Sequence, residues 1–419
     1  MLLRPSATAA CLASAVAFAA CSPRTAPAPA PRIDAIRVTA TAAPYDASRD
    51  SLRYDGEAHI RNVRQLTFGG NNAEAYWSFD DTQLIFQSDW GRINSQGCDQ
   101  QFVMNADGSP IEGGAASVPS PETHYRRVST GQGRTTCGYF LPSGRVVFAS
   151  THRESRACPP AAQMTGGRYV WSIYDSYDIY TANADGSDVQ PLITGPGYDA
   201  EATVSPDGRY IVFTSTRSGD LELWRYEIAT GALRQLTDTP GYDGGAFFSR
   251  DSGQLVWRAS RPEGDELADY RRLLATGLVE PREMELFVAR ADGSDARQVT
   301  RLPGANWAPF FHPDGRRIVF ASNHESVTAG TGGRIFAIYI IGADGTGMEK
   351  IIDSETFDAF PMFSFDGTRL VFASNRNATR TPSRDTNVFV ADWVETPTAA
   401  DRAFRSAVPT PASSPPGGR

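Results

Sequence analysis

The chain has 419 residues, 41% of them hydrophobic, which is enough for one large or two ordinary folded domains. Its formal net charge of −8 argues against nucleic acid as a partner. Beyond the N-terminus, no stretch is apolar enough to span a membrane.

The first 21 residues have the pattern of an export signal. Arg4 precedes a run of small, apolar residues that ends in Phe18-Ala19-Ala20-Cys21. Small residues before a cysteine are what lipoprotein signal peptidase requires, so we expect residues 1–21 to be a lipoprotein signal peptide and Cys21 to be lipidated. An ordinary secretory signal cut nearby is the alternative. Residues 22–59 begin Pro/Ala-rich and are predicted to be a flexible tether.

Two turn motifs then alternate along the chain. In the first, a turn such as Pro206-Asp207-Gly208 leads into a short β-branched and aromatic run that ends at Ser215. Close copies cover 312–322 and 364–374, and weaker copies start at Ser78, Leu141 and Ser249. The second motif is Ala-Asp-Gly, which occurs at 106–108, 184–186, 291–293 and 343–345 with a variant at 229–231. Each copy follows a strand-like run and is typical of a hairpin turn.

Six such repeats predict an all-β fold, a six-bladed β-propeller of four-stranded blades over residues 60–394. The last repeat lacks an outer strand, while Val63–Thr67 near the N-terminus matches the outer strand Leu233–Thr237. We therefore expect the N-terminal strand to complete the last blade and close the ring. The Pro/Ser/Gly-rich residues 395–419 are predicted to be a disordered tail.

The repeats differ in length because insertions separate their second and third strands. The insertions cover about 90–100, 153–172, 261–283, 324–334 and 377–386. Strand direction alternates within a blade, so all five insertions are expected at one end of the ring, opposite the two turn motifs. Residues 261–283 have helical apolar spacing and predict a short amphipathic helix. Loops on rigid scaffolds carry function, and the insertion end is therefore the predicted functional face.

Three cysteines follow Cys21, namely Cys98, Cys137 and Cys158, and all map to the insertion end near the first two blades. In an oxidising envelope two of them are expected to form a disulfide. Three pairings are possible and the sequence does not choose among them. A reactive thiol or a metal site is the functional alternative.

Acidic residues recur at the start of the inner strands. Asp199, Asp243 and Asp358 occupy equivalent positions, and Glu74 and Glu201 lie two positions further along their strands. Inner strands line a propeller channel, so these carboxylates could form a ring at its mouth that binds Ca²⁺ or a cationic peptide. The alternative is that the aspartates cap the turns between blades.

A second column of candidate residues stands at the end of strand two in five blades: His152, Arg217, Arg261, His324 and Arg376. Histidine and arginine there could bind an anionic sugar or coordinate a transition metal. The alternative is that the arginines pair with neighbouring aspartates as structural salt bridges.

The paired turns and the Arg-Gln-Leu-Thr strand resemble the Pro-Asp repeats of TolB, the periplasmic component of the Tol system. The segments 97–100, 135–140 and 306–312 are similar to signatures of TolB-like envelope lipoproteins. The resemblance covers about 60–394 and implies a periplasmic or envelope protein, anchored to the membrane through a lipid only. It implies the fold more strongly than an activity, because that group has no well-defined activity.

These patterns favour a non-enzymatic, monomeric propeller that binds an envelope protein, peptide or glycan through its insertion end, or that acts as a scaffold. No cofactor is expected, although Ca²⁺ or a transition metal at the channel mouth stays open. The alternative is a metal-assisted lyase or hydrolase acting on an acidic oligosaccharide, because oligogalacturonate lyases are similar propellers with metal-bound histidines. A Gly-x-Ser-x-Gly nucleophile elbow is absent from the sequence.

Overall fold

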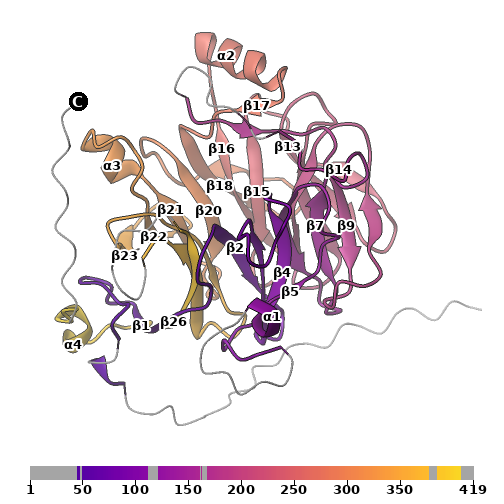
Figure 1. Cartoon of the computed structure of the whole chain (residues 1–419). Helices are drawn as coiled ribbons and strands as arrows, with labels where there is room; N and C mark the ends of the chain where they lie inside the picture. The colour runs from indigo at the N-terminus through magenta and orange to yellow at the C-terminus, as the bar shows by residue number, and fades with distance from the viewer. Residues whose placement is uncertain are drawn as a thin grey trace, which may run out of the picture. The chain divides into compact units, whose positions relative to one another are not determined.

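A computed structural model of the chain describes residues 45–47, 50–111, 121–160, 162, 168–376 and 385–406. Six four-stranded antiparallel sheets form the blades of a β-propeller (Figure 1). The predicted fold class is confirmed. The predicted signal peptide with Cys21 lies outside the described residues.

The strands follow the order expected for each repeat, from the axis outward. The first blade holds β2 (Asn72–Trp77), β3 (Gln83–Ser88), β4 (Gln100–Asn105) and β5 (Arg126–Arg127). The second holds β6 (Thr135–Phe140), β7 (Val146–Ser150), β9 (Asp178–Ala182) and β10 (Gln190–Ile193). The third holds β11 (Asp199–Val204), β12 (Tyr210–Ser215), β13 (Glu222–Glu227) and β14 (Leu233–Gln235).

The fourth blade holds β15 (Asp243–Phe248), β16 (Gln254–Ser260), β18 (Met284–Arg290) and β19 (Arg297–Gln298). The fifth holds β20 (Asn306–Phe311), β21 (Arg317–Ser322), β22 (Ala337–Gly342) and β23 (Glu349–Ile352). The sixth holds β24 (Asp358–Phe363), β25 (Arg369–Ser374) and β26 (Asn387–Trp393), with β1 (Ile60–Gln65) as its outer strand. The described helices are α1 (Pro121–His124), α2 (Gly264–Leu274), α3 (His324–Thr328) and α4 (Ala399–Arg402).

The repeated Ser-x-Asp-Gly turn is built by its own side chains. In the third blade Ser205 donates a hydrogen bond to Asp207 at 2.6 Å, and the amide of Tyr210 donates to the Ser205 hydroxyl at 2.9 Å. Gly208 takes the left-handed conformation (φ 71°) that the turn requires. The turn therefore delivers the chain into strand two, whose run Ile211–Phe213 is fully buried between neighbouring blades.

Each inner strand carries a bulge at the same place. The pairing with strand two shifts register there in all six blades. The bulged residue has a left-handed backbone in each blade, with φ between 44° and 59°: Glu74, Cys137, Glu201, Gly245, Ala308 and Phe360. Bulges re-aim side chains, and here they place one equivalent residue from every blade around the axis.

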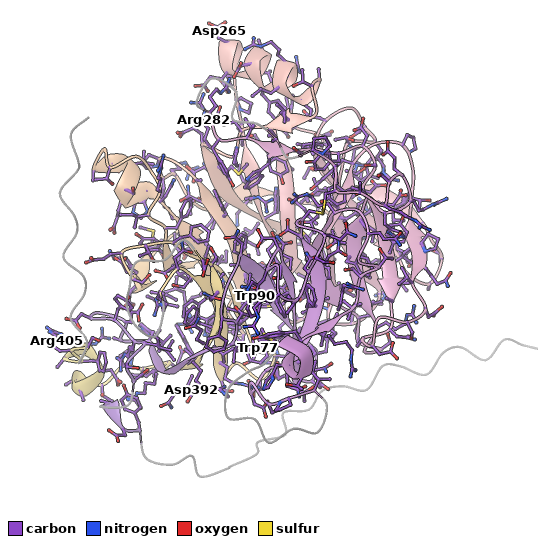
Figure 2. The ribbon with its side chains drawn as sticks, viewed as in Figure 1. Trp77, Trp90, Asp265, Arg282, Asp392 and Arg405 are labelled. Carbon is purple, nitrogen blue, oxygen red and sulfur yellow. A yellow bond between two sulfur atoms is a disulfide. The ribbon has the colours of Figure 1, made fainter. Side chains whose placement is uncertain are left out.

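The predicted insertions near 90–100, 153–172, 261–283 and 324–334 lie between strands two and three, and the predicted helix in the fourth blade is α2. Most of the fifth insertion, 377–386, lies outside the described residues. Figure 1 shows α2 and β17 (Leu278–Val279) together at the upper end of the view. In Figure 2, Asp265 and Arg282 mark the same insertion before and after β17. We call this end of the ring the insertion end, and the end with the Ser-x-Asp-Gly turns the turn end.

The segments that flank the propeller differ from the sequence prediction. Residues 50–59, predicted to belong to the tether, pack on the sixth blade, because Glu57 pairs with the buried Arg376 at 2.6 Å. Residues 395–406, predicted to be disordered, include α4, whose Asp401 accepts two hydrogen bonds from Arg61 at 2.7 and 2.6 Å. Buried ion pairs of this kind fix segments that composition alone marks as flexible. No helix of the described residues is long and apolar enough to cross a membrane.

Candidate functional site

A pocket of about 400 Å³ lies on the propeller axis. The six bulged inner-strand residues all line it, so the bulge of every blade faces the same cavity. A pocket of this size at the mouth of a rigid ring is a common place for ligand binding. We call it the axial pocket.

Aromatic rings meet across the axis beneath the axial pocket. The Tyr76 ring lies 5.7 Å from that of Tyr139 and 5.3 Å from that of Phe247, and Phe247 lies 5.4 Å from Phe310. These residues come from blades one, two, four and five. Tyr76 and Phe247 belong to the buried core and also form part of the pocket wall.

Two insertions join above the pocket. The short strand β8 (Trp171–Ser172) from the second blade pairs with β17 from the fourth, passing over the third blade, whose own connection is short. Arg168 fixes this pairing, because its guanidinium bonds Asp269 of α2 at 2.5 Å and Glu280 at 2.8 Å. We call this two-stranded sheet the β8–β17 bridge.

The bridge contributes aromatic walls to the axial pocket. Trp171 packs edge-on against Trp307 of the fifth blade at 5.3 Å and against Tyr242 of the fourth at 6.4 Å. Tyr270 of α2 donates a hydrogen bond to Asp220 at 2.5 Å, which ties the insertion to the third blade. The bridge is therefore held by contacts to blades three, four and five.

Glu201 is neutralised by a dense set of partners. Arg258 bonds its carboxylate at 2.5 Å, Tyr242 donates at 2.6 Å, Thr214 at 2.7 Å and the Gly245 amide at 2.8 Å. A Cβ at Gly245 would stand 1.7 Å from Arg258 Nη1, so glycine there makes room for the guanidinium. Glu201 therefore stabilises the junction of blades three and four and is not a free charge.

Glu74 occupies the equivalent position in the first blade, but its carboxylate has a different environment from that of Glu201. Its Oε2 is buried and has no hydrogen-bond partner among the described residues, although the side chain as a whole is partly exposed. Burial raises its pKa to about 7, and the charges of Glu201 and Asp99 add to this. Arg258 and the Cys137 thiol act in the opposite direction. Burial also raises the pKa of the Cys137 thiol, so that thiol stays protonated.

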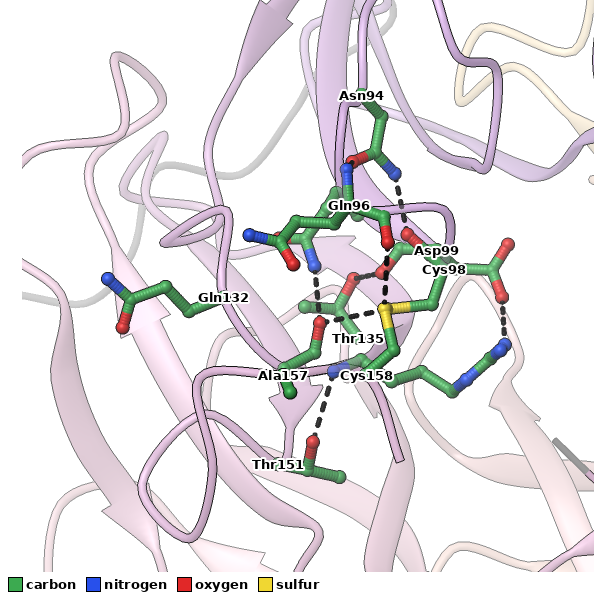
Figure 3. Close-up of a disulfide and its surroundings, with 12 residues drawn as sticks. Asn94, Gln96, Cys98, Asp99, Gln132, Thr135, Thr151, Ala157 and Cys158 are labelled. Atoms are coloured by element: carbon green, nitrogen blue, oxygen red, sulfur yellow. Dashed lines mark hydrogen bonds and ion pairs between the residues drawn. A yellow bond between two sulfur atoms is a disulfide. The ribbon is translucent and has the colours of Figure 1, made fainter. Parts of the chain in front are cut away.

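A disulfide and an ion pair border the pocket at blades one and two. Of the three pairings left open by the sequence, the structure has Cys98–Cys158 (Figure 3), with the two Cα atoms 6.0 Å apart. Cys137 is free. The bond joins the first blade's insertion to the start of the second blade's insertion. Next to Cys98, the partly exposed carboxylate of Asp99 pairs with Arg134 at 2.5 Å.

The three predicted aspartates do not line the axial pocket. Their side chains are buried within their blades, where they pair with the arginines at the end of strand two. The pairs are Asp199–Arg217 at 2.6 Å, Asp243–Arg261 at 2.7 Å and Asp358–Arg376 at 3.2 Å. The prediction of a carboxylate ring is wrong for these three, because each aspartate is turned towards strand two. The alternative interpretation, structural Asp–Arg salt bridges, holds for all three pairs.

The two predicted histidines lie apart, in blades two and five. His152 Nδ1 bonds Ser150 at 2.8 Å and its ring lies 4.3 Å from Tyr180; His324 Nδ1 bonds Ser322 at 3.0 Å beside Tyr339. Burial lowers the pKa of both imidazoles. Within the described ranges, no group of three or more His, Cys, Asp or Glu side chains could hold a metal ion.

Sequence reasoning missed the bridge and most of the polar network around Glu201. One signal was present, because Arg258 interrupts the apolar run of a strand that is otherwise buried. A charged residue in such a strand needs a buried partner. Trp171 gave no such signal, since its insertion has no repeat equivalent.

Comparison with known proteins finds TolB relatives, although no family model matches. The chain is 30% identical over 202 residues to the TolB homolog of Chlorobium chlorochromatii, which covers 44% of this chain and 41% of that protein. It is 29% identical over 148 residues to the Tol-Pal system protein TolB of Anaeromyxobacter dehalogenans, covering 35% and 28%. The chain therefore spans less than half the length of these relatives. The structure of a putative TolB from Agrobacterium tumefaciens matches 79% of this chain and 97% of that one, with 16% identity and a TM-score of 0.49.

The relatives matched in sequence are named TolB, and the structure contains the six blades that the repeats predict. The chain is accordingly a TolB-like six-bladed β-propeller protein.

Proposed function

We propose that this chain is a non-enzymatic protein of the bacterial cell envelope that binds a partner through its insertion end. The observation that carries this proposal is the β8–β17 bridge, in which two of the five insertions join over a pocket on the axis. The turn end, by contrast, consists of short turns that bond internally. A rigid ring with elaborated loops at one end is a common design for recognition.

The envelope location draws support from the relatives that are named as Tol-Pal system proteins. A protein of the same envelope system is the first class of partner to test, and an envelope peptide or glycan is the second. The predicted lipid anchor at Cys21 and the monomeric state are parts of this proposal that rest on the sequence and need their own measurement. Replacing Cys21 by alanine should release the protein from the membrane fraction.

The alternative, a metal-assisted lyase or hydrolase, rested on His152 and His324. Both rings bond the serine at the end of the preceding strand and lie tilted against a tyrosine of their own blade. These contacts within one blade give each histidine a structural role. No observation on the described residues favours the alternative over binding.

Affinity capture from envelope extract tests the proposal. In the test variant, residues 261–283 are replaced by the short connection of the third blade, residues 216–221. The control variant is Arg316→Glu, which reverses an exposed charge at the turn end. We expect the same partner to be captured by the wild type and the control and to be lost from the test variant. A partner that stays bound to the test variant would show that the insertion end is not the binding surface.

A further inference from the structure

We propose that the axial pocket binds a single cationic group of the ligand, a primary ammonium or a guanidinium, with Glu74 as its counter-ion. This inference rests on the proposed function and specifies the chemistry at the centre of the binding surface. It concerns a lysine or arginine side chain, or an amino terminus, that enters the ring from the insertion end.

The charges that line the pocket leave Glu74 uncompensated. Five charged side chains line it: Glu74, Asp99, Arg134, Glu201 and Arg258. Asp99 pairs with Arg134, and Glu201 pairs with Arg258, both at 2.5 Å. The charges within each of these two pairs cancel, so the lining carries one excess negative charge when Glu74 is ionised.

One oxygen of the Glu74 carboxylate also lacks a hydrogen-bond donor among the described residues. Its Oε2 is buried without a hydrogen-bond partner, and an unsatisfied carboxylate oxygen is costly in a protein interior. Its like-charged neighbours, Glu201 and Asp99, belong to other elements and already have partners. A ligand in the axial pocket that brings a positively charged N–H donor to the Glu74 carboxylate would supply the missing charge and a charge-assisted hydrogen bond.

The walls of the pocket suit an organic cation. Ten aromatic side chains of the described residues line it, from several blades and from the bridge, among them Tyr76, Trp171, Tyr177, Tyr198 and Trp307. The pocket already contains such a contact, because the Arg258 guanidinium lies 5.4 Å from the Trp171 ring and 5.2 Å from the Tyr242 ring. Aromatic faces attract ammonium and guanidinium groups and exclude the water that would otherwise screen Glu74.

A metal ion fits this lining less well than an organic cation does. Ca²⁺ takes about six to eight oxygen ligands, whereas Glu74 is the one lining carboxylate without a cationic partner. Among the residues that the structure describes, no three His, Cys, Asp or Glu side chains are grouped so that they could hold a metal ion.

The test compares two probes that differ in one charged group. Nα-acetyl-lysine methylamide carries the ammonium, and Nα-acetyl-norleucine methylamide replaces it by a methyl group. Binding to the full-length protein is measured by titration calorimetry and ligand-observed NMR at pH 8, where Glu74 is ionised. We expect the lysine probe to bind at least about tenfold more tightly than the norleucine probe, since a charge-assisted hydrogen bond is lost in the latter.

Two variants connect that preference to Glu74. Glu74→Gln is expected to weaken lysine-probe binding about tenfold while the variant still unfolds in a cooperative thermal transition. The matched control is Glu222→Gln, because Glu222 shares with Glu74 a buried Oε2 that has no hydrogen-bond partner among the described residues, but it lies outside the pocket lining. The control should bind the probe like the wild type.

Three results would overturn the inference: equal binding of the two probes, full binding by Glu74→Gln, or equal loss in both variants. Ca²⁺ binding that depends on Glu74 in a protein that ignores the lysine probe would also overturn it, in favour of a metal. These failures are separate from failure of the proposed function, because capture of a partner at the insertion end does not depend on this probe.

Discussion

Glu74 and Glu201 take equivalent positions in two blades, yet only Glu201 has a cationic partner. The difference comes from the neighbouring blade. Gly245 leaves room beside Glu201 for Arg258, whereas the residue next to Glu74 is Cys137, which brings a thiol and no charge. Equivalent residues of the repeat therefore lie in equivalent places, whereas the ionisation state of each side chain depends on its partners.

The raised pKa of Glu74 predicts a specific pH dependence of stability. Between pH 4.5 and about 7 the folded protein holds a proton on Glu74 that the unfolded chain releases. The free energy of unfolding therefore falls as pH rises through this window, by up to about 3 kcal/mol. Glu74→Gln removes this loss, so the variant should gain more in melting temperature over the wild type at pH 8 than at pH 5. An equal difference at both values would show that Glu74 has an ordinary pKa.

Arg376 predicts a large stability effect. Its guanidinium is fully buried and pairs with both Glu57 and Asp358. Arg376→Ala leaves two buried carboxylates without a cation and should cost about 3–5 kcal/mol in urea denaturation. Arg217→Ala is the matched control, since Arg217 pairs with Asp199 alone and is partly exposed, so its loss should cost less. A larger loss in the control would contradict this account of the sixth blade.

At the scale of elements, the sequence predicted the blades because turn chemistry and strand composition repeat. Ser205, Asp207 and Gly208 build their turn through local hydrogen bonds, and the copies in other blades do the same. The insertions could be predicted from the spacing between repeats, and α2 from the helical spacing of its apolar residues. The β8–β17 bridge could not be predicted, because two-residue strands from non-adjacent blades pair through tertiary contacts that no local pattern records.

The ion pairs of Arg168 are expected to control opening of the β8–β17 bridge. Arg168→Ala removes the contacts to Asp269 and Glu280, so amide hydrogen exchange in β8 and β17 should accelerate while the inner strands stay protected. Arg272→Ala is the control, because Arg272 pairs with the same Asp269 from a largely exposed position. Unchanged exchange in β8 and β17 of Arg168→Ala would mean that backbone pairing and Trp171 hold the bridge without Arg168.

At the scale of the whole molecule, the two ends of the described chain meet at the sixth blade. β1 pairs with β26, and the amide of Leu66 continues this ladder to Val388 at 2.8 Å. We predict that deleting residues 60–68 exposes β26 as an edge, lowers the melting temperature and promotes aggregation. A peptide of residues 50–68 added in trans should restore the melting temperature. An unchanged melting temperature of the deletion variant would contradict the interpretation that β1 closes the ring.

The candidate site could be predicted only in part at this scale. The bulge column, including Glu74 and Glu201, followed from counting along the inner strands. The aspartates were placed wrongly, because alternation along a strand cannot show that a bulge between Ala200 and Thr203 turns Glu201 to other partners than Asp199. The packed residues 50–59 were missed, since one buried pair, Glu57–Arg376, joins positions 319 residues apart.

The claim that the insertion end binds a partner is tested most directly by photo-crosslinking in living cells. A benzophenone amino acid replaces Tyr169, which is 59% exposed beside the β8–β17 bridge, and in a second strain replaces the exposed Arg316 at the turn end. We predict a discrete crosslinked adduct from position 169 and none from position 316. An adduct from position 316 alone would contradict the account.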